Sequence, residues 1–112
     1  MADIGAIPSS ISVVIDPAVT APAVGNTFRF QPTDSTADAS ATFQATGTLT
    51  GLSSDLQISL DAGATFVTIA GGVAFLTAAA PQKTLTPAIG NAMYRFNHTA
   101  STGNAVIRTL AN

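Results

Sequence analysis

The sequence predicts an all-β protein that folds as a single small β-sandwich of about seven to nine short strands. Three observations indicate this class. Val, Ile, Thr and Phe dominate the patterned segments, and these residues fit the pleated surface of a sheet. Turn residues recur at intervals of about 8 to 12 positions, a spacing typical of sandwiches and barrels. No segment keeps the three-and-four apolar spacing of an amphipathic helix, and Glu is absent.

Length and composition indicate one domain. The chain has 112 residues, enough to hold a modest core without metals or crosslinks. The absence of Cys excludes disulfides and thiolate metal sites. We divide the chain into an extended N-terminal arm, residues 1–25, and a β-sandwich domain, residues 26–112, that is Ig-like or jelly-roll-like.

The arm is apolar and contains Pro8, Pro17 and Pro22. A proline cannot donate a hydrogen bond to a β-ladder, which favours an extended segment with one strand at residues 10–15. We expect the arm to dock on the domain itself or on a neighbouring subunit. Its candidate contact residues are Ile4, Ile7 and Pro8.

Alternation and turns predict the strands of the domain in order. Phe28 and Phe30 share one face of the first strand, because successive side chains of a strand point to opposite faces. The last two strands are expected to pair as a hairpin around residues 99–103. A central hairpin strand is expected to share one face among Leu56, Ile58 and Leu60. The predicted strands are residues 26–31, 42–50, 55–60, 65–69, 73–79, 83–86, 92–98 and 104–110.

The turn of the central hairpin carries the sharpest local motif. It resembles the Asp-box, S-x-D-x-G-x-T-W, with an aromatic Phe in the last position. An Asp in such a turn accepts hydrogen bonds from turn amides, a Gly takes the positive φ, and the aromatic ring packs beneath. We interpret the motif as a structural turn that stabilises the hairpin. Its residues are Ser59, Asp61, Gly63, Thr65 and Phe66.

Charge is scarce. Charged residues make up 9% of the chain, against about 25% in an average domain. With four basic residues and a net charge of −2, the chain has no basic patch to neutralise a run of phosphates, which argues against nucleic-acid binding. Two explanations of the low charge stay open: a surface in permanent contact with partners, or one solvated by Thr, Ser, Asn and Gln. The uncharged residues 62–82 contain Gly and Pro and alternate in polarity, so we interpret them as strands and not a membrane span.

No catalytic or metal-binding constellation is evident. His98 is the single His, and without a second His or Cys it lacks the converging ligands of a metal site. Asp34, Asp38 and Asp55 do not have the spacing of a calcium loop. A Ser-His-Asp set can be written with His98, but no G-x-S-x-G motif or phosphate-binding loop accompanies it. We therefore expect no enzyme activity and no cofactor.

Arg95 and Arg108 lie on the last two predicted strands, each between apolar residues. If those strands pair, the two guanidinium groups project near one another. Two interpretations remain: solvated strand arginines, or an interface pair for acidic groups on a partner.

A wider resemblance covers residues 51–110. The order "LQISLDAGATFVTIAG" (56–71), an apolar strand, "AMYRFNHTAS" (92–101) and "AVIRTL" (105–110) is similar to that of small bacteriophage virion proteins. Those proteins usually have Gly and Trp where this chain has Ala62 and Phe66. The resemblance implies a head-decoration or cement protein that binds the major capsid protein and stabilises the shell.

This resemblance also implies a location and an assembly. The protein is expected to be made in the host cytoplasm, since no signal peptide is visible, and to reside on the capsid surface of the virion. A homo-oligomer, with a trimer favoured, is implied. The alternative is a carbohydrate-binding or adaptor module of a phage tail or fibre, which would show a cluster of exposed aromatic residues; the chain has no Trp and one Tyr.

Overall fold

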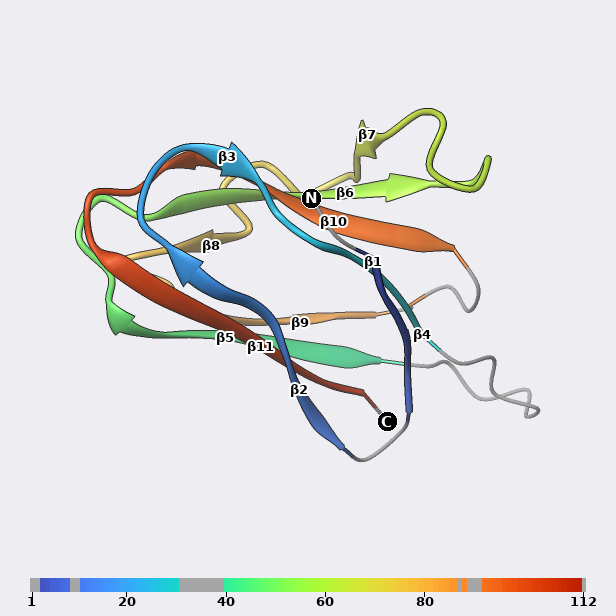
Figure 1. The fold of residues 1–112 in the computed structure, drawn as a ribbon, viewed down its shortest axis with the longest axis horizontal. Coiled ribbons are helices and arrows are strands. Elements are labelled where there is room, and N and C mark those ends of the chain that lie inside the picture. The colour runs from blue at the N-terminus through green and yellow to red at the C-terminus, as the bar shows by residue number, and fades with distance from the viewer. Residues whose placement is uncertain (1–2, 9–10, 31–39, 87, 89–91, 112) are drawn as a thin grey trace.

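The computed structural model describes residues 3–8, 11–30, 40–86, 88 and 92–111 and confirms an all-β fold, with two sheets packed as a sandwich (Figure 1). The first sheet has the order β1(Asp3–Ile7), β4(Thr27–Phe30), β10(Met93–Ala100), β6(Ser53–Ser59) and β7(Val67–Thr68). Two short strands also join it, β3(Ala23–Val24) on β10 and β8(Leu76–Thr77) on β6. The second sheet has the order β2(Ser12–Val19), β11(Asn104–Ala111), β5(Ala41–Thr48) and β9(Gln82–Leu85). No helix that could span a membrane occurs in the described ranges.

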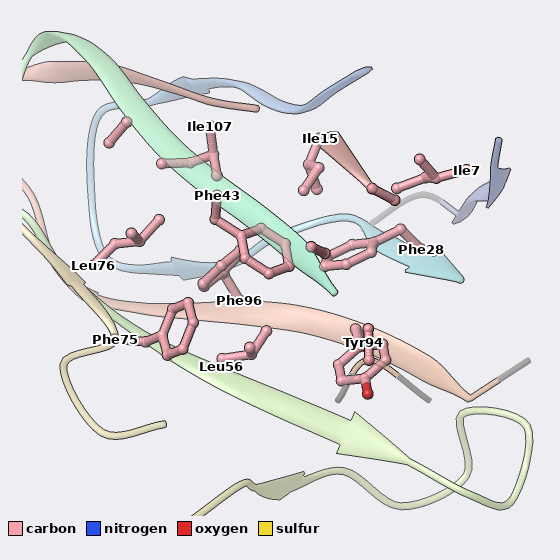
Figure 2. Close-up of a cluster of buried hydrophobic side chains, with 14 of the residues drawn as sticks. Ile7, Ile15, Phe28, Phe43, Leu56, Phe75, Leu76, Tyr94, Phe96 and Ile107 are labelled. Carbon is pink, nitrogen blue, oxygen red and sulfur yellow. The ribbon is translucent and has the colours of Figure 1, made fainter. Parts of the chain in front are cut away.

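The core lies between the two sheets and is rich in aromatic rings (Figure 2). Phe28 and Phe30 are both buried on one face of β4, as their alternation predicts. Phe43 of the second sheet meets Phe96 of the first edge to face, with ring centroids 5.2 Å apart, a favourable geometry for aromatic pairs. Tyr94 lies in the same cluster, 1% exposed. Contacts between rings of opposite sheets therefore hold the two layers together.

The N-terminal segment is part of both sheets. β1 pairs in parallel with β4, and β2 pairs with β11 as an edge strand of the second sheet. Ile7, Ile15 and Val19 are buried in the core. Of the two docking alternatives, the structure shows docking on the domain itself: the described part of residues 1–25 is built into the sandwich and does not stand apart from residues 26–112 as an arm. Pro17 fits because β2 is an edge strand.

The last two strands do not form the predicted hairpin. β10 pairs with β6, β4 and β3, whereas β11 pairs with β2 and β5. The connection at residues 101–103 carries the chain from the first sheet to the second (Figure 1). It packs on the β5–β6 connection, where the Thr102 amide donates to the Thr50 carbonyl oxygen at 3.0 Å. The prediction failed because turn residues mark a reversal of the chain but not whether it stays in one sheet.

The central hairpin is shorter than predicted. β7 contains two residues and β6 ends at Ser59. Leu56 is buried and Ile58 is partly buried, but Leu60 lies beyond the end of the strand and is 79% exposed. The shared face therefore ends at Ile58. An exposed Leu60 is one of the features that the alternation pattern did not anticipate.

Candidate functional site

A buried polar cluster joins the two sheets. Asp16 comes from β2 of the second sheet, and Ser54 and His98 come from β6 and β10 of the first. His98 Nε2 lies 2.8 Å from Asp16 Oδ2, and His98 Nδ1 lies 2.7 Å from Ser54 Oγ. All three residues are at most 5% exposed. The imidazole therefore bridges a carboxylate on one sheet and a hydroxyl on the other.

The second carboxylate oxygen of Asp16 closes the loop that follows β2. The Asn26 amide donates to Asp16 Oδ1 at 2.7 Å, and Asn26 Nδ2 donates to the Ile15 carbonyl oxygen at 2.8 Å. Gly25 lies against the carboxylate so closely that a Cβ atom there would collide with it. No buried side-chain polar atom in the described part of the chain lacks a partner. The cluster thus fastens residues 16–26 where the chain passes from one sheet to the other.

This set contains the residue types of a catalytic triad, but its geometry indicates a structural role. In a triad, the Ser hydroxyl must reach a substrate carbonyl, with Ser on Nε2 and Asp on Nδ1 of the His. Here the two ring nitrogens are used the other way round, and Ser54 is 0% exposed. A cleft of about 330 Å³ does adjoin Asp16 and His98, lined otherwise by residues 17–21 and 23–26, from the end of β2 through β3 to Asn26. Ser54 does not line it.

The Asp-box-like turn forms the hydrogen bonds that the motif predicts. Ser59 Oγ donates to Asp61 Oδ1 at 2.6 Å, and the Thr65 amide donates to the same oxygen at 2.9 Å. The Gly63 amide donates to Ser59 Oγ at 2.9 Å. Ala62 and Gly63 both have positive φ, 59° and 91°. Hydrogen bonds from the Ser59 hydroxyl and the Thr65 amide lower the pKa of Asp61, because they stabilise its charged form.

Phe66, the aromatic residue of the motif, stacks on Arg95. The guanidinium carbon lies 3.9 Å from the ring centroid, within the range of a cation–π contact. Arg95 Nε also donates to Gln57 Oε1 at 2.7 Å. The contacts of Arg95 are therefore intramolecular, and they hold the turn against the outer face of the first sheet.

The proposed interface residues are not brought together. Arg95 lies on β10 of the first sheet, while Arg108 lies exposed on β11 of the second. The two strands do not pair, so the expected arginine pair does not form. Ile7 is buried, and Ile4 and Pro8 are partly buried, with Ile4 packed against the core.

Sequence patterns missed an apolar recess at the end of the β6–β7 hairpin. The recess has a volume of about 330 Å³ and is lined by Ile58, Leu60, Asp61, Thr65 and Val67. Leu60 and Val67 are 79% and 60% exposed. The apolar residues on either side of the turn are a sequence signal for the recess. The signal was missed because the alternating pattern predicted that Leu60 is buried in the core.

No group of three potential metal-ligating side chains occurs in the described ranges. Of the three residues considered for calcium, Asp34 and Asp38 lie outside those ranges. Asp55 Oδ1 accepts a hydrogen bond from the Ala74 amide at 2.8 Å, which is the turn role that Asp commonly has.

Comparisons with known proteins yield one distant structural likeness. No family model and no curated protein matches the sequence. Among solved structures, the chain is similar to the pre-peptidase C-terminal domain of a collagenase from Bacillus anthracis, with a TM-score of 0.49 and 10% sequence identity. The alignment covers 100% of this chain and 95% of that domain.

Proposed function

We propose that this protein is a capsid decoration protein that binds the major capsid protein and stabilises the shell. The virion-like order of strands in residues 51–110 supports this class. The observation that carries the proposal is the exposed apolar recess formed by Leu60, Val67 and Ile58. Its side chains are available for burial against another protein, whereas His98, Asp16 and Ser54 are buried inside the sandwich.

The mechanism is binding. Covering Leu60 and Val67 with a partner surface removes apolar area from water, which is favourable by about 25 cal/mol per Å². A ligand that binds the assembled shell and not its dissociated subunits stabilises the shell by mass action. Many copies that each bind weakly then stabilise the shell together. In a homotrimer, three capsid-binding sites are joined in one molecule, which raises the overall affinity.

The distribution of aromatic residues disfavours the carbohydrate-binding alternative. Six of the seven aromatic side chains, Phe28, Phe30, Phe43, Phe75, Tyr94 and Phe96, are at most 4% exposed. Phe66, the seventh, is partly buried and covered by Arg95. A sugar-stacking platform of exposed rings is therefore lacking, which favours a protein partner over a glycan.

The test is co-sedimentation of the purified protein with capsids that lack it. We expect the parent protein to bind and to raise the melting temperature of the capsids. The double variant Leu60→Ser/Val67→Ser should bind at least about tenfold more weakly, because two side-chain burials are lost. Val73→Ser is the matched control, since Val73 is 73% exposed but does not line the recess.

Two results would each reject one part of the proposal. A parent protein that does not bind capsids rules out decoration. Equal binding by the parent and the double variant removes the recess from the interface. Sedimentation of the isolated protein tests the trimer separately.

A further inference from the structure

The outer face of the second sheet carries a polar groove that no feature above explains. Its volume is about 300 Å³, and it crosses all four strands of the sheet. Among the described residues, the groove is lined by hydroxyl, amide, guanidinium and aliphatic side chains and by no carboxylate; the lining residues are Ser12, Thr42, Gln44, Gln82, Arg108, Thr109 and Leu110.

Arg108 is the one basic side chain in the chain with no partner among the described residues. Arg29 forms an ion pair with Asp3, with 3.0 Å between Arg29 Nη1 and Asp3 Oδ2. Arg95 stacks on Phe66, and Lys83 Nζ lies 5.0 Å from the ring centroid of Phe75. No ion pair, hydrogen bond or ring contact engages Arg108 in the described ranges. Its guanidinium therefore keeps its donors available.

The neighbours of Arg108 add further donors. Arg108 lies opposite Gln44 on β5 and Val14 on β2 in the sheet register. Gln44 Nε2 donates to Gln82 Oε1 at 3.2 Å, which leaves the amide group of Gln82 free to donate into the groove. The Ser12 hydroxyl lines the same groove. One positive charge surrounded by neutral donors matches a group with one negative charge.

We propose that this groove binds a carboxylate side chain presented by the partner protein. The inference rests on the proposed function and names the chemistry of its partner. A guanidinium can hold a carboxylate through two parallel hydrogen bonds. Arg108 is the one cationic side chain among the lining residues, and the chain has a net charge of −2, so the groove favours a single carboxylate over a polyanion. Leu110, 47% exposed beside Arg108, provides an apolar contact for the methylene groups of a Glu.

The test uses two short peptides that differ in one residue, a neutral Gly/Ser sequence with a central Glu and the same sequence with Gln. Addition to ¹⁵N-labelled protein should shift the Arg108 Nε–H signal and the side-chain amide signals of Gln44 and Gln82 with the Glu peptide alone. Arg108→Gln should weaken binding at least tenfold, and Arg108→Lys should weaken it less. Lys83→Gln is the control, because Lys83 is an exposed cation on β9 that does not line the groove.

Each other outcome is decisive. No shift up to about 10 mM Glu peptide, equal shifts with both peptides, or shifts that persist in Arg108→Gln would overturn the inference. Stronger binding of inorganic phosphate or glucuronate than of the Glu peptide would replace it with another anion. Capsid binding separates the two proposals: if Arg108→Gln binds capsids like the parent, the groove fails as the contact while decoration stands. If the parent does not bind capsids, decoration fails and the peptide titration still decides the groove.

Discussion

His98 Nε2 and Asp16 Oδ2 lie 2.8 Å apart and connect strands of opposite sheets. Both side chains are almost fully buried: 3% of the His98 side chain and 7% of the Asp16 side chain is exposed. Each side chain therefore loses its hydrogen bonds to water on folding and gains an internal one. The contribution of this contact to the free energy of unfolding depends on both partners being present.

Removal of either partner should destabilise the protein strongly. His98→Ala leaves Asp16 Oδ2 and Ser54 Oγ without their imidazole partner in the interior, and we expect a loss of about 2 to 4 kcal/mol in the free energy of unfolding. Asp3→Ala, which breaks a partly exposed ion pair with Arg29, should lose less than about 1 kcal/mol. Urea denaturation measures both values. Equal losses in the two variants would contradict a structural role for the buried bridge.

Gly25→Ala tests the close packing of the loop on Asp16. The added Cβ would collide with the Asp16 carboxylate, which is held by Asn26 and His98. We expect a loss of about 1 to 3 kcal/mol from overpacking. Ala23→Ser, at an exposed position two residues earlier, should unfold like the parent. A Gly25→Ala protein with parental stability would show that the loop can move without disturbing the cluster.

Acid should remove the contribution of Asp61 to stability. Its pKa is lowered in the folded state below the ordinary value of 3.8, chiefly by the Ser59 hydroxyl and the Thr65 amide. The unfolded state therefore binds a proton first as the pH falls, so this contribution is present above pH 3.8 and is lost as the pH drops through the lower folded pKa.

The expected result is a smaller decrease in melting temperature for Asp61→Asn than for the parent between pH 4.5 and pH 2, about the range in which carboxylates titrate. The other carboxylates, including Asp3, contribute equally to both proteins, so the difference isolates Asp61. Parallel melting curves across this range would contradict the assignment of these hydrogen bonds.

Deletion of residues 1–25 should prevent folding. The deletion removes Ile7, Ile15 and Val19 from the core and Asp16 from the buried cluster. It also exposes the edges of β4 and β11. Circular dichroism and proton NMR of the truncated chain measure the result. A folded truncated protein would instead support the arm that the proline content predicted.

Local physics made several of the strands and one turn predictable, although the strands expected at residues 65–69 and 73–79 contain only two residues each, Val67–Thr68 and Leu76–Thr77. Alternation located Phe28 and Phe30 on the buried face of β4, because the two-residue period of a strand depends on the backbone alone. The turn at Asp61 forms its hydrogen bonds with residues no more than four positions away. The residues of the motif therefore suffice to predict the conformation of the turn. The all-β class followed from the same short-range signals.

Tertiary structure decided the pairing of strands and the identity of the buried cluster. β10 and β11 have similar alternation, and either could pair with several partners; burial of one apolar face against the opposite sheet selected one arrangement. Asp16 and His98 are 82 positions apart, beyond the reach of any local pattern. Leu60 is exposed because β6 ends one residue earlier. The sequence by itself determined which residues can form strands and turns, and the packing of two sheets determined which of them meet.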